Sequence, residues 1–264
     1  MADDAVEFSV DGPVATATLN QPDRRNALSP AIEVGLQAAL DEALDADARC
    51  LVIEGAGGAF SAGGDIDKME RRLDDDVPAD ERVRELERTT NQLIARIVTF
   101  PLPTVSKIDG PAVGAGANLA IATDVQLASA RAVVGFVFRG VGLSVDAGTS
   151  YLLPRIVGEN VAKELVLTGE IVDAERALDL GLVNHVYPTE SFDERADEIV
   201  ATIAEGPTVA LRHAKRLVGE GLNKSLEEAL VDEARAQGIV FETRDHAEGV
   251  RAFLEGRDPA FEGR

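Results

Sequence analysis

Apolar and polar residues alternate near the start of the chain, in the runs Val6–Val10 and Val14–Leu19. Alternation with a period of two is typical of a strand that has one buried face. Asp11-Gly12-Pro13 lies between the two runs and is a turn signal. The pattern therefore predicts a β-hairpin.

A helix and a buried strand are predicted after the hairpin. Ser29 is a favourable N-cap residue and Pro30 suits the first helical position, so we predict a helix that runs to about Leu44. Arg49–Glu54 is a short, mostly apolar run that ends at Gly55. This run indicates a buried strand.

The middle of the chain continues the alternation of strands and helices. We expect strands at Thr104–Ile108 and Asp124–Leu127, with a glycine-rich helix from Val113 to Ala122 between them. Asn91–Val98 has the pattern of a helix. The segment Asp67–Glu87 in front of it is dense in charge, and we interpret it as a mobile, solvated connection that leads into this helix.

The pattern changes after Tyr187, where helical segments replace the alternation. Glycine or asparagine breaks separate the predicted helices, which are Ser191–Glu205, Pro207–Glu220, Ser225–Phe241 and Thr243–Glu255. The predicted fold class is therefore α/β, with a core over residues 1–190 and a helical region over residues 191–264.

The chain carries a formal net charge of −21. Nucleic acid and anionic membrane surfaces would be repelled, so we expect neither as a partner. Acidic residues are spread along the whole chain, which suits a halophilic protein whose surface repulsion is screened by salt. No run approaches the roughly 20 apolar residues of a membrane helix, and the acidic N-terminus does not resemble a signal peptide. We expect a cytoplasmic location.

Residues that could hold a metal ion are scarce. The chain has three histidines, and none of them is paired at the spacing of metal ligands. We therefore predict no metal site. The single cysteine, Cys50, lies in the predicted strand before Gly55 and is expected to be buried.

Two glycine-rich stretches each join a predicted strand to a predicted helix. They cover Gly55–Asp65 and Gly110–Ala117. Glycine and alanine let a ligand approach the backbone closely, and the N–H groups at a helix N-terminus are free to donate. Neither stretch has the spacing of a Walker A or dinucleotide-binding motif. Together they predict a paired anion hole made of backbone N–H groups.

Motifs along nearly the whole chain match one family in the expected order. They are Gln21–Leu28, Ala59–Ile66, Pro103–Gly110, Gly114–Gly116, Asp124, Leu152–Gly158, Leu167–Gly169, Gly181–Val183 and Gly249–Glu255, with Phe261. On these residues the chain resembles the crotonase (enoyl-CoA hydratase/isomerase) superfamily. The resemblance implies a crotonase-type spiral of ββα units with a helical C-terminal trimerisation region, assembled as a homotrimer or homohexamer. It also implies an acyl-CoA thioester substrate and no separate cofactor, since coenzyme A is part of the substrate.

The resemblance places the expected site on this chain. The two backbone N–H groups that hold the thioester oxygen fall at Gly64 and Ala115. The residues implied in binding coenzyme A are Arg25, Ala27, Ala62, Asp65 and Ile66, with Phe261 and Arg257 contributed by a neighbouring subunit. The carboxylates of Asp65 and Asp124 themselves are expected to be structural.

Hydratases of this family use two glutamates, and both are absent here. The first position, six residues before Asp124, holds Asn118, and the second, four residues before Gly142, holds Phe138. Neither an amide nor a phenyl ring exchanges protons with a substrate. Both positions are expected to line the substrate site. Asn118 could orient the substrate or merely pack, and we favour packing or a minor polar role.

Asp146 stands at the position where isomerase members of the family, including the ring-epoxide isomerase of phenylacetate breakdown, carry an aspartate. One carboxylate suffices for isomerisation, because it can take a proton from one carbon and return it two carbons away. We predict an enoyl-CoA isomerase with Asp146 as the base. An apolar wall that includes Phe138 would raise the pKa of Asp146.

Several alternatives stay open at this point. Asp146 could cap the helix that follows it, or act as the nucleophile of a dehalogenase or thioesterase. The protein could be an enoyl-CoA hydratase with a substitute for both glutamates. It could also be a non-catalytic acyl-CoA binder or an RNA-binding relative, although the net charge disfavours RNA.

Overall fold

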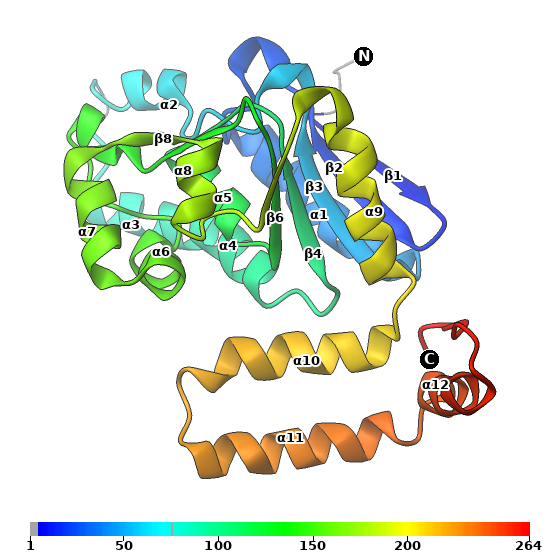
Figure 1. The fold of residues 1–264 in the computed structure, drawn as a ribbon. Helices are drawn as coiled ribbons and strands as arrows, with labels where there is room; N and C mark the ends of the chain where they lie inside the picture. The colour runs from blue at the N-terminus through cyan, green and yellow to red at the C-terminus, as the bar shows by residue number, and fades with distance from the viewer. Residues whose placement is uncertain (1–4, 75) are drawn as a thin grey trace.

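The computed structural model describes residues 5–74 and 76–264. A six-stranded sheet forms the centre of its core, as Figure 1 shows. The strands, in order across the sheet, are β1 (Val6–Asp11), β2 (Val14–Leu19), β3 (Cys50–Gly55), β4 (Thr104–Ile108), β6 (Val125–Ser129) and β9 (His185–Tyr187). β1 and β2 pair antiparallel, and all the later neighbours pair parallel. The predicted hairpin and the α/β class are confirmed.

A second, smaller sheet was not expected from the sequence. It contains β5 (Pro111–Val113), β7 (Val133–Gly135) and β8 (Ile171–Asp173). Strands of three residues are too short to show a period-two pattern. Because β5 occupies the start of the predicted helix Val113–Ala122, that helix, α5, begins later and spans Ala115–Ile121.

Helix α1 (Pro30–Asp45) has the predicted start and end. The Ser29 hydroxyl accepts a hydrogen bond from the Ile32 N–H at 3.3 Å, which satisfies one of the free N–H groups of the first turn. The helix buries one face, including Leu36 and Leu40, in the main hydrophobic cluster. α4 (Thr90–Val98) contributes Leu93 and other residues to the same cluster.

The interpretation of Asp67–Glu87 as a mobile connection is wrong for most of that segment. It contains most of α2 (Ile66–Arg71) and of α3 (Ala79–Arg88). Glu85 on α3 pairs with Lys68 at 2.7 Å and with Arg72 at 2.5 Å, so ion pairs fasten the two short helices to each other. Three of the charged residues in this segment, Lys68, Arg72 and Glu85, therefore join two helices.

The remaining core helices are α6 (Thr149–Val157), α7 (Glu159–Thr168), α8 (Ala174–Asp179) and α9 (Phe192–Ala204), with 3₁₀ turns η1 (Pro22–Arg24), η2 (Ala56–Gly58), η3 (Val137–Val141) and η4 (Thr189–Ser191). α9 packs on the sheet, where Phe192, Ala196 and Val200 cluster with strand residues. Cys50 belongs to this cluster and is fully buried, as predicted.

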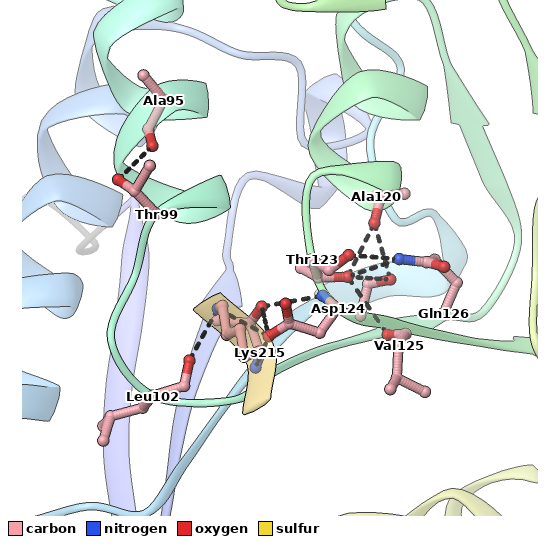
Figure 2. A network of polar contacts seen from close by, with 11 residues as sticks. Ala95, Thr99, Leu102, Ala120, Thr123, Asp124, Val125, Gln126 and Lys215 are labelled. Carbon is pink, nitrogen blue, oxygen red and sulfur yellow. Dashed lines mark hydrogen bonds and ion pairs between the residues drawn. The ribbon is translucent and has the colours of Figure 1, made fainter. Parts of the chain in front are cut away.

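Helices α10 (Thr208–Gly221), α11 (Leu226–Val240) and α12 (Arg244–Glu255) extend below the core in Figure 1. Figure 2 shows one point where α10 meets the core. The Lys215 ammonium lies 2.7 Å from Asp124 Oδ2 and donates to the Leu102 carbonyl at 2.9 Å. The same Asp124 oxygen accepts from the N–H of Thr104 at 2.7 Å, so Asp124 is structural, as expected.

The C-terminal tail folds back onto α12 and the core. The Asp245 carboxylate accepts from the N–H groups of Glu262 and Gly263, at 2.7 and 2.8 Å. Arg49 donates to the Phe261 carbonyl at 3.0 Å. Among the described residues, no helix has the length and apolarity that a bilayer crossing requires.

Candidate active site

Asn26 joins the segment in front of α1 to the first glycine-rich stretch. Its side chain is fully buried and donates to the carbonyls of Ala56 and Ala59, at 2.9 and 2.8 Å. Its Oδ1 accepts from the Gln21 N–H at 2.9 Å, and its φ is +54°. Asn26 belongs to the Gln21–Leu28 motif but is not among the site residues predicted from the sequence. An asparagine in a tight turn, where its side chain bonds to nearby backbone, is the signal that was available.

The two glycine-rich stretches lie against each other. Ser61 and Val113 connect them, because the Val113 N–H donates to the Ser61 carbonyl at 3.0 Å. Gly63 has a φ of +87°, and a Cβ at this position would lie 2.5 Å from the Val113 oxygen and 3.3 Å from the Ala115 nitrogen. Only glycine therefore permits this approach.

The N–H groups of Gly64 and Ala115 are free donors at this junction. Neither donates a hydrogen bond to any group within residues 5–74 and 76–264. Ala115 is the first residue of α5, so its N–H has no partner within the helix. Such backbone donors, fixed in place before a ligand binds, are suited to an oxygen that gains negative charge.

The residues expected to bind coenzyme A divide into two groups. Arg25, Ala62 and Ile66 lie around the first glycine-rich stretch, where the Ala62 N–H donates to the Arg25 carbonyl at 2.8 Å and Ile66 is 62% exposed. Ala27 lies in the same segment and is buried. The Asp65 carboxylate caps α2 through the Lys68 N–H.

Asp65 also pairs with Arg24 at 2.6 Å, so its side chain is structural, as expected. Phe261 and Arg257 form the second group, in the C-terminal tail, and Figure 1 places the C-terminus on the opposite side of the molecule from α2. The Arg257 guanidinium pairs with Glu248 at 2.6 Å, which raises its pKa further above its ordinary value. Among the described residues, no hydrogen bond or ion pair joins Arg257 or Phe261 to the glycine-rich stretches.

Asp146 lies in a left-handed turn that leads into α6. Ala147 has a φ of +48° and Gly148 a φ of +81°, and the Thr149 N–H donates to the Asp146 carbonyl at 2.9 Å. A Cβ on Gly148 would lie 3.2 Å from the Ile94 side chain, so the turn also fits tightly against α4. Two consecutive residues with positive φ are typical of type I′ turns.

Among the described residues, no side chain or backbone group bonds to the Asp146 carboxylate. Its Oδ1 is buried and makes no hydrogen bond within the described part of the chain. The N-cap residue of α6 is Gly148, and no side chain caps this helix, so Asp146 is not a helix cap. Burial raises the pKa of the Asp146 carboxyl above its ordinary value, because desolvation disfavours the charged form.

Asn118 connects the Asp146 turn to α5, the helix that begins at Ala115. Its amide donates to the Asp146 carbonyl at 3.1 Å, and it lies three residues after Ala115 on α5. Three residues advance a helix by about 5 Å. The main chain at Asp146 is thus hydrogen-bonded to α5 about one helical turn from the Ala115 N–H.

Phe138 lies in η3, just before this turn. It is 8% exposed and belongs to the same hydrophobic cluster as Ala147. The Leu143 N–H donates to the Phe138 carbonyl at 3.1 Å, which ties η3 to the start of the Asp146 segment. Phe138 and Ala147 are therefore apolar and buried on either side of Asp146 in the sequence.

The sequence of this chain is similar to those of known proteins. The profile of the enoyl-CoA hydratase/isomerase family matches residues 10–264. A Thermus thermophilus protein provisionally named an enoyl-CoA hydratase is 40% identical over 252 residues, which are 95% of this chain and 98% of that protein. The 1,2-epoxyphenylacetyl-CoA isomerase of Escherichia coli K12 is 33% identical and covers 95% of both chains.

Solved structures agree with the sequence comparisons. An enoyl-CoA hydratase from Polaromonas sp. JS666 superimposes with a TM-score of 0.91 and 31% identity, over 97% of this chain and 99% of that structure. The fold expected from the resemblance is therefore confirmed. The chain belongs to the enoyl-CoA hydratase/isomerase family, the crotonase superfamily.

Proposed function

We propose that this protein is an enoyl-CoA isomerase that moves a double bond within an acyl-CoA thioester. The family acts on acyl-CoA thioesters, and its named members include both hydratases and isomerases. The choice between these reactions depends on which side chains can exchange protons with the substrate.

The proposed reaction needs one carboxylate and one anion hole. Asp146 removes a proton from C2 of a 3-enoyl thioester, and the electron pair moves toward the thioester oxygen. The N–H groups of Gly64 and Ala115 donate to this oxygen in the dienolate. Protonated Asp146 then returns its proton to C4, and the C2=C3 double bond forms.

The observation that carries the proposal is the Asp146 Oδ1 atom, which is buried and has no partner among the described residues. A buried polar atom without a hydrogen bond costs about 1–3 kcal/mol. A purely structural aspartate would relieve this cost by bonding to a neighbour. The free oxygen and the raised pKa of this carboxyl instead suit a group that receives and returns a proton.

The second candidate is an enoyl-CoA hydratase, which the name of the Thermus thermophilus relative favours. Hydration needs one group to activate water and an acid to deliver a proton to C2. Asn118 bonds to Asp146 and Thr149, and Phe138 has no exchangeable proton. Asp146 alone would have to perform both steps, so we favour isomerisation.

The test is a parallel assay of 3-enoyl-CoA and 2-enoyl-CoA substrates with the wild-type protein and Asp146→Asn. We expect isomerisation to exceed hydration, and Asp146→Asn to lose about 100-fold or more in kcat, in line with loss of a general base. Asp173→Asn, which removes an aspartate that caps α8, is the matched control and should keep its activity.

Each other outcome identifies an alternative. Hydration as fast as isomerisation, or full activity of Asp146→Asn, would refute the proposed mechanism. Calorimetric binding of acyl-CoA without turnover would indicate a non-catalytic binder. A covalent aspartyl adduct would show that Asp146 is a nucleophile.

We also propose that residues 191–264 include an oligomerisation region and that the protein forms a homotrimer or homohexamer. Supporting this, α10–α12 carry large apolar side chains that one chain leaves exposed, including Val218 (78%), Leu222 (73%) and Phe253 (86%). Large exposed apolar areas are typical of protein interfaces. Light scattering on the purified protein tests the proposal, and a monomeric mass at micromolar concentration would contradict it.

A further inference from the structure

Three groups converge on the main-chain carbonyl of Asp146. The Asn118 amide lies 3.1 Å from this oxygen, the Thr149 hydroxyl 2.8 Å and the Thr149 backbone N–H 2.9 Å. Asn118 is fully buried and Thr149 is 2% exposed. Of the two side chains, Asn118 comes from α5 and Thr149 from the first residue of α6.

The positions of the hydrogens follow from the set of donors and acceptors. The Thr149 hydroxyl has a single proton, and the Asn118 Oδ1 lies 2.9 Å from it. When the hydroxyl donates to Oδ1, the amide of Asn118 and the backbone N–H of Thr149 remain to donate to the Asp146 carbonyl. In this arrangement Oδ1 and the Asp146 carbonyl each accept, and each donor has a partner. Flipping the Asn118 amide would instead place two carbonyl oxygens against each other, so the network fixes its orientation.

The network holds a turn that is unfavourable by itself. Ala147 has a φ of +48°, and an L-residue in the left-handed region costs roughly 1–2 kcal/mol. The strained turn decides where the carboxylate of Asp146 points. Its attachment to α5 also fixes its distance from Ala115, because Asn118 and Ala115 belong to the same rigid helix.

We propose that Asn118 and Thr149 are positioning residues, which clamp the Asp146 turn to α5 and so aim the carboxylate at a substrate held by the Ala115 and Gly64 N–H groups. This inference rests on the proposed function of Asp146. It assigns the amide at position 118 a definite task, where the sequence led us to expect packing or a minor polar role.

The test uses Thr149→Val, which keeps the shape of the side chain and removes its hydroxyl. The variant leaves Asn118 Oδ1 without its donor, so the turn loses one side of the clamp. We expect kcat for isomerisation to fall about 10- to 100-fold with KM changed less than about threefold, since a misplacement of about 1 Å costs up to roughly 100-fold. Thr149→Ser restores the hydroxyl and should recover most of kcat.

Thr123→Val is the matched control. Thr123 lies beyond the C-terminal end of α5 and is also buried. Its hydroxyl donates to the Ala120 carbonyl at 2.9 Å. It should lose stability as Thr149→Val does, with kcat unchanged. Equal kcat in Thr149→Val and wild type, or no recovery in Thr149→Ser, would overturn the proposal.

A second measurement separates this inference from the proposed function. Carbon-13 NMR of labelled aspartate carboxyls follows the titration of Asp146 without turnover. We expect Thr149→Val, but not Thr123→Val, to move the Asp146 pKa toward its ordinary value. If the protein proves not to be an isomerase and this shift is present, the clamp stands and only the proposed reaction fails. If neither variant changes the titration, the clamp is refuted.

Discussion

Replacing Lys215 by methionine should loosen the attachment of α10 to the core. Methionine keeps the apolar stem of the side chain and removes the ammonium. The variant loses the 2.7 Å ion pair with Asp124 and the hydrogen bond to the Leu102 carbonyl. Burial lowers the pKa of Lys215, so this ammonium depends on its partners for solvation.

The magnitude follows from the burial of the two partners. Exposed ion pairs contribute about 0.2–1 kcal/mol, whereas removing one partner of a buried pair costs about 3–5 kcal/mol. The Lys215 side chain is 13% exposed and that of Asp124 32%, so the pair lies between these cases. The Asp124 carboxylate also keeps its bonds to Thr104, which limits the loss. We expect a loss of about 2 kcal/mol, which lowers the melting temperature by about 4–8 °C for a chain of this size.

The assay is thermal unfolding by circular dichroism at fixed protein concentration, because assembly makes the melting temperature concentration-dependent. Lys163→Met is the matched control, since Lys163 forms an exposed pair with Glu159 on α7. It should lower the stability by no more than about 0.5 kcal/mol. Equal losses in Lys215→Met and Lys163→Met would refute the reasoning. Faster hydrogen exchange confined to α10 in Lys215→Met would support it.

Three further predictions concern buried groups and the glycine-rich stretch. The pKa of Asp146 is raised in the folded protein, so ionising this carboxyl destabilises the fold above pH 3.8, its ordinary pKa. Asp146→Asn should therefore raise the melting temperature at neutral pH and leave it unchanged at pH 3. An unchanged or lower melting temperature at pH 7 would contradict this. Cys50 is fully buried and its pKa is raised to about 12, so a thiol reagent should label it only as fast as the protein unfolds. Rapid labelling of the native protein would contradict this prediction. Gly63→Ala places a methyl group 2.5 Å from the Val113 oxygen at a φ of +87°, and it should cost more than about 2 kcal/mol of stability. In Gly64→Ala the added methyl group meets only the end of a flexible side chain, so this variant should keep its fold. Melting curves of the two variants test the difference.

Local patterns were sufficient to predict most of the core. The hairpin and α1 depend on alternation, on a turn signal and on the Ser29 cap, all of which lie within a few residues. A helix after Gly55–Asp65 was expected and α2 begins there, but the ion pair between Lys68 and Glu85 that joins it to α3 could not be predicted, because no local pattern reveals it. The three-residue strands of the second sheet were missed because a period needs more residues to become visible.

The candidate site was predictable to a similar extent. The glycine-rich stretches pointed to the backbone donors, because glycine and alanine at strand-to-helix junctions have a physical meaning alone. The clamp on Asp146 could not be predicted, since Asn118 and Thr149 are 31 residues apart and their contact exists only in the folded chain. Whether Asp146 is free or caps a helix likewise depends on tertiary packing.

The two halves of the site differ in how evolution can change them. The donors at Gly64 and Ala115 are main-chain groups, so a point substitution alters the side chain at these positions and leaves the N–H in place. A side chain such as that of Asp146, Asn118 or Phe138 can be replaced in one step. On the proposed function, new reactions can arise by exchange of such side chains, while the main-chain donors proposed to stabilise the enolate are inherited with the fold.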